Sequence, residues 1–339
     1  VGRLGYAERQ LVMIARALSR DARVLILDEP TASLEAREVE RLFQVIDGLK
    51  KDGVAIAYVS HRLDEIDTLA DLCTVMRDGR VVASSPRGAL TRDQMIRLMT
   101  GRDLEELHQP HDRTPGAKLM HARHGEDEIS VHEREIVGLA GLLGSGTTDL
   151  LRRLFGAEGD GGTGIKSPAA AIGRGLGLVP GERSHGLIME LSVRENIILP
   201  NLSKFSRFWR LDTSAIDRLV DELMETVDIR PRDPDRPVRE LSGGNQQKII
   251  FARWLAGHAK ILLLDEPTHG IDVGAKAQIH RLMRRFADDG GGIVFSSSEM
   301  VEVMSISDRV IAMRAGDIVA SITRDGDYTE RALRTALGG

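Results

Sequence analysis

The hydrophobic positions of this chain gather in short runs that alternate with segments of helical periodicity. Segments 35–50 and 217–227 have the amphipathic pattern of helices. The apolar runs are rich in branched side chains, as is typical of buried parallel strands, and lie at 24–27, 54–59, 136–140, 261–264 and 293–295. This alternation predicts a layered α/β fold.

The first residues fit the middle of such a fold rather than its beginning. Apolar residues at Leu11, Ile14, Ala15 and Leu18 follow the i, i+3, i+4, i+7 template of a helix, yet no strand precedes them. No charged-then-apolar signal segment follows Val1. We therefore expect that an upstream portion of the domain is missing from this chain.

One set of residues occurs twice at a constant separation of 237 positions. The first members are Leu4, Gln10, Ala15, Arg16, Leu18, Asp28, Glu29, Pro30, Thr31, Ser60, Asp71, Met76 and Gly79. Their partners are Leu241, Gln247, Ala252, Arg253, Leu255, Asp265, Glu266, Pro267, Thr268, Ser297, Asp308, Met313 and Gly316. The constant offset indicates two copies of one domain. We predict an incomplete first copy at 1–100, a linker at 101–125 and a second copy at 126–339.

The predicted linker is polar, rich in His, Arg, Asp and Pro, and has no periodicity. It contains four histidines: His108, His111, His121 and His124. No regular element is predicted to fix their spacing, so solvated linker histidines are favoured and a metal site stays the alternative.

Composition narrows the classes of function. A net charge of −5 provides no basic surface for a phosphate backbone, so nucleic acid is not expected as the main partner. No apolar run approaches the roughly eighteen residues that span a bilayer. The single cysteine, Cys73, excludes an internal disulfide and suits a reducing compartment.

In both copies an apolar strand ends in Asp-Glu-Pro. A carboxylate at the carboxyl end of a buried parallel strand faces the crevice in which ligands bind, where Asp28 and Asp265 can hold Mg²⁺. The adjacent Glu29 and Glu266 can orient or deprotonate an attacking water. An acidic turn without catalytic function is the alternative, and the second occurrence at the same offset disfavours it.

A glycine-rich segment, Leu-Ser-Gly-Gly-Asn-Gln-Gln, occupies 241–247. Ser242 is a good N-cap, and Gly243 and Gly244 leave backbone N–H groups accessible at the start of a helix. The segment is therefore predicted to bind an anion such as phosphate.

The Leu-Ser-Gly-Gly segment followed by Asp-Glu-Pro resembles the ATP-binding-cassette (ABC) ATPases, and the likeness extends over essentially the whole chain. The strings at 265–276 and 192–197 are similar to the second half of fused ATPases from monosaccharide importers of the ribose, galactose and xylose group. Residues 28–34 and 58–65 are similar to the first half. The resemblance implies an α/β P-loop NTPase fold of the ABC-cassette type, duplicated, with the first copy incomplete.

The same resemblance implies ATP and Mg²⁺ as cofactors and ATP-driven sugar uptake as the function. It implies a separate transmembrane sugar permease, contacted by the stretch around 182–195, and indirectly a periplasmic or extracellular sugar-binding protein. The location implied is peripheral, on the cytoplasmic face of the membrane. The alternatives are a soluble tandem cassette protein without a permease and a nucleotide-binding fragment without turnover. The mixed charge of the linker and one degraded site favour the importer.

In this family two cassettes, paired within or between chains, sandwich two ATP molecules. The resemblance implies that Asp28 and Glu29 hold Mg²⁺ and polarise water in the first site, and that His61 contacts the γ-phosphate. From the opposite half, four residues would close over the same ATP: Ser242, Gly243, Gly244 and Gln246.

The phosphate-binding loop of the second copy departs from G-x-x-x-x-G-K-[ST]. Its candidate nucleotide-binding residues follow the apolar run at 136–140: Gly141, Gly144, Ser145, Gly146, Thr147 and Thr148. Thr147 replaces the lysine, whereas Thr148 can still reach Mg²⁺. Backbone N–H groups and the helix dipole can still hold phosphates, but a charge that stabilises phosphoryl transfer is absent.

Two further departures fall on the same composite site. Ser298 stands where the family has a switch histidine, and Gly5 where the first-half signature has a serine. We hypothesise that this site binds nucleotide but hydrolyses it poorly or not at all. The phosphate loop that would serve Asp28 and Glu29 is expected upstream of Val1, so the chain as written is predicted to have weak or no ATPase activity.

Overall fold

In the computed structural model the chain forms two compact units: the first comprises Val1–Leu107 and the short stretch Asp272–Gly274, and the second comprises His108–Ile271 and Ala275–Gly339. It describes residues 12–14, 16, 22–28, 30, 31, 34, 36–60, 63–77, 79–100, 114–142, 144–207, 210–324, 326 and 328–338. Among these residues, no helix combines the length and the apolar character that a bilayer crossing requires.

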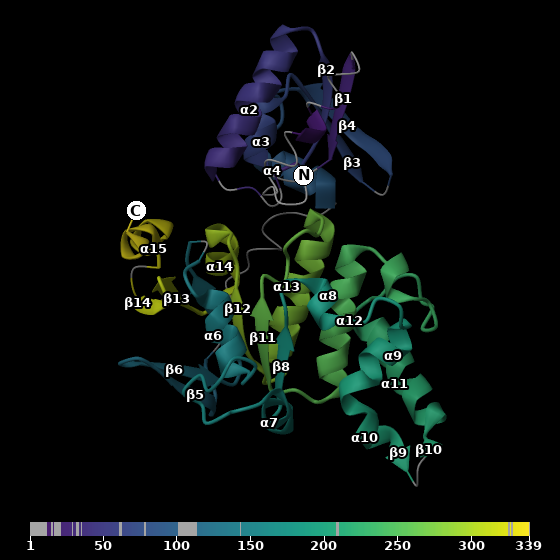
Figure 1. Cartoon of the computed structure of the whole chain (residues 1–339), viewed down its shortest axis with the longest axis vertical. Coiled ribbons are helices and arrows are strands. Elements are labelled where there is room, and N and C mark those ends of the chain that lie inside the picture. Colours follow the sequence, from purple (N-terminus) through teal and green to yellow (C-terminus); the bar gives the residue numbers. More distant parts are fainter. Residues whose placement is uncertain are drawn as a thin grey trace. The chain divides into compact units, whose positions relative to one another are not determined.

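A six-stranded sheet organises the second unit (Figure 1). In spatial order its strands are β14 (Asp317–Thr323), β13 (Arg309–Arg314), β7 (Ile136–Ala140), β12 (Gly292–Ser296), β11 (Ile261–Asp265) and β8 (Leu176–Val179). Neighbours run parallel except β13 and β14, which are antiparallel. Parallel neighbours need crossover connections, and the helices of the unit supply them.

The helices of this unit are α6 (Thr147–Leu154), α7 (Pro168–Gly173), α8 (Arg183–Gly186), α9 (Val193–Ile198), α10 (Leu202–Phe205), α11 (Thr213–Thr226), α12 (Gly243–Ala256), α13 (Val273–Asp288), α14 (Met300–Ile306) and α15 (Glu330–Leu337), with 3-10 turns η1 (Leu199–Asn201) and η2 (Val238–Glu240). Two hairpins complete it: β5 (Lys118–His124) with β6 (Asp127–His132), and β9 (Ser206–Arg207) with β10 (Arg210–Leu211).

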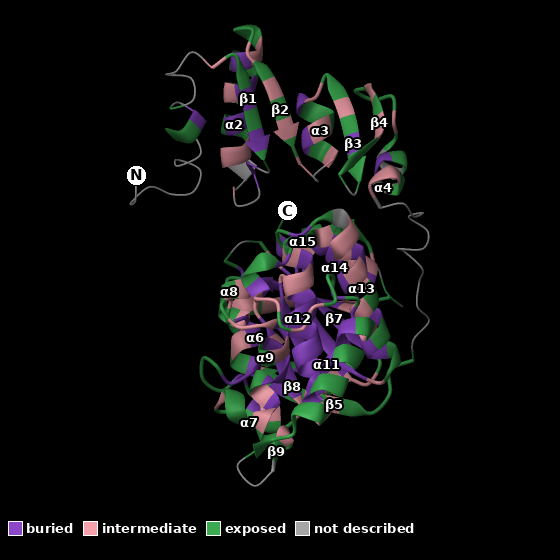
Figure 2. Cartoon of the chain, turned by 90° about the vertical axis from the view of Figure 1, so that its right-hand side faces the viewer, coloured by how far each residue is buried: buried purple, intermediate pink, exposed green. Residues whose placement is uncertain are grey.

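Apolar side chains cover both faces of the six-stranded sheet. Strands β7, β11 and β12 are buried along their full length, which is why their sequences are continuous apolar runs rather than alternating ones. Figure 2 shows the buried residues concentrated inside the second unit. Helix α6 packs on β11 and β12, so the carboxyl ends of these strands and the start of α6 form one rigid edge.

The first unit is smaller and contains two separate two-stranded sheets. Its elements are β1 (Val24–Asp28), α2 (Ala36–Lys51), β2 (Ala55–Val59), α3 (Leu63–Leu69), β3 (Leu72–Arg77), β4 (Arg80–Pro86) and α4 (Arg92–Thr100). Strands β1 and β2 are parallel, and β3 and β4 are antiparallel. Its core is small, with Ile14, Leu42 and Ile46 among its most buried members.

The elements of the first unit recur in the second at the sequence offset of the repeat. Strands β1 to β4 correspond residue for residue with β11 to β14, and α2 and α3 correspond with α13 and α14. The strand registers also match, since Val24 pairs with Ala55 as Ile261 pairs with Gly292. Both antiparallel pairs have a bulge at the same point. Equal residue patterns therefore produce equal local structure in the two units.

One strand position distinguishes the units. In the second unit β7 lies between β12 and β13, whereas no strand among the described residues joins the corresponding β2 and β3. A cavity of about 780 Å³ lies there instead, lined by β2, β3 and residues of α2, α3 and α4. Its wall includes apolar side chains such as Ile56, Leu69 and Val75.

The five predicted apolar strands are present as β1, β2, β7, β11 and β12, and the two predicted helices as α2 and α11, so these predictions are confirmed. The segment expected as linker differs, because β5 lies within it and pairs with β6. In β5, Met120 and Ala122 are buried and polar residues alternate with them, which is the pattern of a half-buried strand, but the polar composition of the whole segment concealed it. The histidines His108 and His111 lie outside the described residues.

Candidate functional site

The candidate phosphate loop joins the fully buried strand β7 to helix α6. The loop closes on itself, since the Ser145 N–H donates to the Leu142 carbonyl over 2.9 Å. It is tied to the turn after β13, since the Gly316 N–H donates to the Ser145 carbonyl over 2.9 Å. Thr147 is the first residue of α6, so the N–H groups that an α-helix leaves unpaired begin here.

Two glycines make this tight loop possible. Gly146, the N-cap of α6, has φ of 92°, and a Cβ there would lie 2.9 Å from the Gly316 Cα. A Cβ on Gly141 would lie 2.2 Å from the Ser145 Oγ. Only glycine fits either position without displacing its neighbour. The sequence predicted the loop, but Gly316 as its neighbour came only from the structure.

Oxygen atoms from three segments meet at the carboxyl ends of β11 and β12. The Thr148 hydroxyl, in the first turn of α6, donates to Asp265 Oδ1 over 2.9 Å. The Ser296 hydroxyl donates to the same oxygen over 2.9 Å. The structure therefore brings together two of the three residues that the sequence predicted as metal ligands, Thr148 and Asp265, while the third, Asp28, lies in the first unit. Ser296 was not predicted, because nothing in its local pattern distinguishes it from the serines that follow it.

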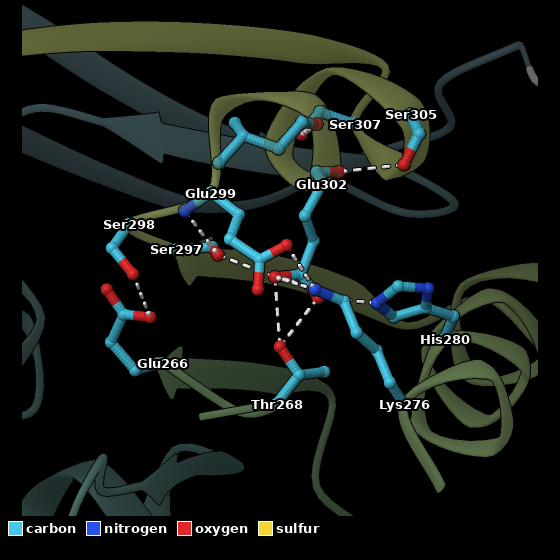
Figure 3. A network of polar contacts seen from close by, with 11 residues as sticks. Glu266, Thr268, Lys276, His280, Ser297, Ser298, Glu299, Glu302, Ser305 and Ser307 are labelled. Carbon is cyan, nitrogen blue, oxygen red and sulfur yellow. Dashed lines mark hydrogen bonds and ion pairs between the residues drawn. The ribbon is translucent and has the colours of Figure 1, made fainter. Parts of the chain in front are cut away.

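Glu266 follows Asp265 in a left-handed conformation, with φ of 44°. Backbone strain of this kind in a non-glycine residue concentrates at functional sites. Its N–H donates to the Ser296 carbonyl over 3.1 Å, and the Ser298 hydroxyl donates to Glu266 Oε2 over 3.2 Å (Figure 3). Ser298, where a switch histidine was expected, thus contacts the candidate catalytic carboxylate.

The environment of Glu266 favours the protonated carboxyl. Burial raises its pKa to about 7, and the negative charges of Glu302 and Asp265 act in the same direction against the smaller effect of the Ser298 hydrogen bond. A carboxyl group with a pKa near neutrality is suited to accept a proton from water. The structure thus places the predicted cation ligand Asp265 beside the predicted catalytic residue Glu266, and both roles stay predictions.

The candidate signature segment lies in a different part of the same unit. Ser242 is the N-cap of α12, and its hydroxyl accepts from Asn245 Nδ2 over 3.0 Å. The Gln246 side chain donates to the Val238 and Leu241 carbonyls over 3.2 and 3.1 Å, so it braces its own segment. Helix α12 packs on α9, α11 and β8, whereas α6 packs on β11 and β12.

The glycines of this signature segment are close to neighbouring groups. A Cβ on Gly243 would meet the Arg183 guanidinium, and one on Gly244 would lie 2.5 Å from the Ala275 Cβ. Arg183 also donates to the Gly270 carbonyl over 3.1 Å. The N-terminus of α12 is therefore held in place by its neighbours, and it includes Ser242, Gly243, Gly244 and Gln246. Contact of these residues with nucleotide stays a prediction.

In the first unit, the structure describes only part of the predicted site. Asp28 is the last residue of β1 and is exposed. Glu29 and His61 lie outside the described residues. Among the histidines of the predicted linker, His124 Nε2 lies 2.6 Å from the Gly316 carbonyl and His121 pairs with Glu128 at 3.3 Å.

A glycine loop between a buried strand and the N-terminus of a helix, beside an oxygen-rich strand edge, is the arrangement of a P-loop NTPase fold. Residues 126–269 match the ABC transporter family. The chain is 42% identical to "Ribose import ATP-binding protein RbsA 2" of Rubrobacter xylanophilus over 355 residues, covering 100% of this chain and 68% of that protein. The chain belongs to the ATP-binding proteins of ABC transporters, a family of ATPases.

Other relatives agree with this assignment. "Xylose import ATP-binding protein XylG" of Burkholderia ambifaria is 38% identical, over 98% of this chain and 69% of its own length. A solved nucleotide-free ATP-binding cassette from an ABC transporter superposes with a TM-score of 0.53 at 17% identity, over 67% of this chain and 96% of that chain. At this identity the structural likeness supports the fold alone. The predicted ABC-cassette α/β fold is confirmed.

Proposed function

We propose that this chain is the ATP-binding and ATP-hydrolysing subunit of a monosaccharide importer. The observation that carries the proposal is the Thr148 to Asp265 hydrogen bond, which joins the phosphate loop to the acidic strand end in one site. Relatives named for ribose and xylose import support the substrate class. The sugar itself would be bound by other subunits.

Each group of the site has a role in this proposal. Thr148, Asp265 and Ser296 offer hydroxyl and carboxylate oxygens, which suit a hard cation such as Mg²⁺. When bound, Mg²⁺ neutralises charge on the β- and γ-phosphates. The loop N–H groups hold the phosphates, and Glu266 orients water and accepts its proton.

The two units are proposed to be halves of a tandem ATPase, the C-terminal part of one cassette at 1–100 and a second cassette at 126–339. The matching elements and registers at the repeat offset support this division. Pairing of cassettes would place Ser242, Gly243, Gly244 and Gln246 over an ATP held by Asp28, Glu29 and His61. The separation of α12 from α6 within one unit supports such pairing, because the signature then serves another site.

The partner is proposed to be a transmembrane permease, reached from the cytoplasmic face of the membrane, with a sugar-binding protein acting indirectly. The site of the second unit is proposed to bind nucleotide but to hydrolyse it poorly or not at all. Thr147 leaves the loop without a cationic side chain, and Ser298 supplies only a hydroxyl to Glu266. Both changes remove charge that would stabilise the transition state.

The Thr147→Lys substitution tests whether this loop binds phosphates. A lysine at the start of α6 would place a positive charge beside the β- and γ-phosphates, and we expect ATP to bind at least about tenfold more tightly. Equilibrium titration with a fluorescent ATP analogue measures the change. Thr213→Lys, at the exposed start of α11, is the matched control for net charge and should leave affinity unchanged. Equal effects of both lysines would contradict the assignment.

The importer and its soluble alternative differ in their response to a permease. Reconstituted with the permease of its own operon in lipid vesicles, the chain in its full tandem form should release phosphate faster when sugar-loaded binding protein is added. A rate of phosphate release that is the same with and without the permease and the binding protein would favour the soluble tandem protein. In the same assay, equal loss of turnover from Glu266→Gln and Glu29→Gln would contradict slow hydrolysis at the second site.

A further inference from the structure

A buried carboxylate, Glu302 on α14, lies next to the candidate site and contacts none of the predicted ligands. Its side chain is 2% exposed. It accepts from the Thr268 hydroxyl over 2.7 and 2.9 Å and from the Ser297 hydroxyl over 2.5 Å (Figure 3). His280 Nε2 lies 2.5 Å and Lys276 Nζ 3.3 Å from its oxygens. Both carboxylate oxygens are therefore fully engaged.

This arrangement stabilises the ionised form of Glu302. Burial alone would raise its pKa, but the hydrogen bond and charge of His280 and the charge of Lys276 outweigh burial and bring the pKa to about 2. A buried carboxylate is stable only when hydrogen-bond donors surround it. Four donors from three segments of the chain meet this requirement, so each segment is fixed relative to α14.

Two of these donors lie directly beside the groups that hold Glu266. Thr268 is two residues beyond Glu266 in the loop after β11, and Ser297 separates Ser296 from Ser298 after β12. Ser296 and Ser298 both form hydrogen bonds with Glu266. Glu302 therefore holds both the segment that carries Glu266 and the segment that bonds to it.

The first unit contains the same network with different donors. At the repeat offset Glu302 corresponds to Glu65, which accepts from the Thr31 hydroxyl over 2.6 Å and from the Ser60 hydroxyl over 2.8 Å. The Tyr58 hydroxyl donates to it over 2.8 Å. Thr31 and Ser60 correspond to Thr268 and Ser297.

The remaining donors differ between the two units in a compensating manner. Tyr58 of the first unit corresponds to Phe295, which has no hydroxyl. In return, Val39 and Phe43 of the first unit correspond to Lys276 and His280 of the second. Different side chains thus satisfy the same carboxylate, which points to the carboxylate and the two loop hydroxyls as the required elements.

We propose that Glu302 is a positioning residue that holds the 266–270 loop and, with it, Glu266, and that Glu65 does the same for the corresponding loop of the first unit. Glu302 does not touch the reacting atoms. It acts by fixing Thr268 and Ser297 on either side of the general base. The inference rests on the proposed role of Glu266.

Hydrogen exchange of the 265–271 peptide tests this positioning without requiring turnover. In Glu302→Gln, the side-chain NH2 of Gln can only donate a hydrogen bond, so it cannot accept from the hydroxyl groups that bind the carboxylate. We expect hydrogen exchange in this peptide to be at least about tenfold faster, while the sheet strands keep their protection. Thr268→Val, which removes one donor at nearly constant volume, should have a smaller effect of the same kind. Glu299→Gln is the matched control on α14, since exposed Glu299 contacts Lys276 but not the loop.

A variant of the second unit that carries the hydrogen-bond donor of the first unit tests whether a different donor can keep the loop protected from exchange. The triple variant Lys276→Val, His280→Phe and Phe295→Tyr exchanges two donors of Glu302 for the tyrosine hydroxyl that Glu65 accepts from, and its loop exchange should stay within about threefold of the original. Loop exchange unchanged in Glu302→Gln would overturn the inference. A uniform loss of protection across the whole second unit would also overturn it. So would exchange of the 265–271 peptide that is as fast in the triple variant as in Glu302→Gln.

Phosphate release by a tandem form that carries Glu29→Gln, in which only the slow second site turns over, separates this inference from the proposed function. Glu302→Gln should lower kcat at the second site and leave KM for ATP within about twofold, because the phosphate loop is untouched. Glu266→Gln should lower kcat and leave loop exchange unchanged. If Glu266→Gln keeps full turnover while Glu302→Gln opens the loop, the role of Glu266 is wrong and the positioning of its loop stands.

Discussion

Strands β1 and β11 have equivalent positions in the repeat, end in the same Asp-Glu-Pro sequence and pair in register with equivalent partners. Every residue of β11 is buried, whereas burial alternates with exposure along β1. The same contrast separates β12, which is buried throughout, from β2. Ile26 is 72% exposed and its counterpart Leu263 is 0% exposed.

This difference shows that a strand and its burial have separate causes. The apolar run is sufficient for strand formation and register in both units. Burial depends on neighbours: β11 has β8 and β12 beside it and α6 above, while β1 has only β2 among the described strands. The cavity between β2 and β3 has the same origin, because β7 fills the corresponding position in the second unit.

The largest expected effect comes from matched truncations in the two strands. Leu263→Ala removes a fully buried side chain and should lower the free energy of unfolding by about 2–5 kcal/mol. Ile26→Ala removes a mostly exposed one and should change it by about 0.5 kcal/mol or less. Urea unfolding measures the second unit through Trp254, and hydrogen exchange measures the first. Equal costs would show that β1 is as buried in solution as β11.

A pH experiment sharpens the comparison at the strand ends. Because the pKa of Glu266 is raised to about 7, the folded state binds this proton more tightly than the unfolded state, so stability falls as pH rises from about 4.5 through 7. Glu266→Gln should remove this loss, with a gain of roughly 3 kcal/mol at pH 8 and almost none at pH 4. Urea titrations of the nucleotide-free chain across this range measure it. Parallel pH profiles for both proteins would contradict the pKa.

The smallest expected effect concerns an aspartate that precedes β3 in one unit and β13 in the other. Asp308 Oδ2 accepts from the Ile136 N–H at the start of β7 over 2.8 Å, so Asp308→Ala should cost about 1.5 kcal/mol. The equivalent Asp71 forms an exposed ion pair with Lys50 at 3.0 Å, and Asp71→Ala should cost about 0.5 kcal/mol or less. Thermal unfolding of each variant measures the difference. Similar costs would mean that Asp71 has a backbone partner comparable to Ile136.

Several features followed from the sequence because they depend on local residue patterns. Continuous apolar runs predicted β7, β11 and β12, and the constant offset predicted equivalent elements in the two units. The glycine loop after β7 and the acidic ends of β1 and β11 placed the candidate site on the correct sheet edge. The signature segment and the Asp-Glu-Pro strand ends were enough to identify the ABC ATPases by resemblance.

Other features arose only from contacts between distant segments. Nothing local marks Ser296 as a partner of Asp265, or Gly316 as the neighbour that excludes a side chain at Gly146. Strand β5 was missed because its few apolar positions lie in a segment rich in His and Arg, and pairing with β6 identifies it as a strand. The Glu302 network joins residues 5 to 34 positions apart, and the burial of β11 comes from strands and helices supplied by the rest of the unit. A residue pattern specifies an element, but only the packing of elements determines which side chains lose contact with water and which polar groups meet.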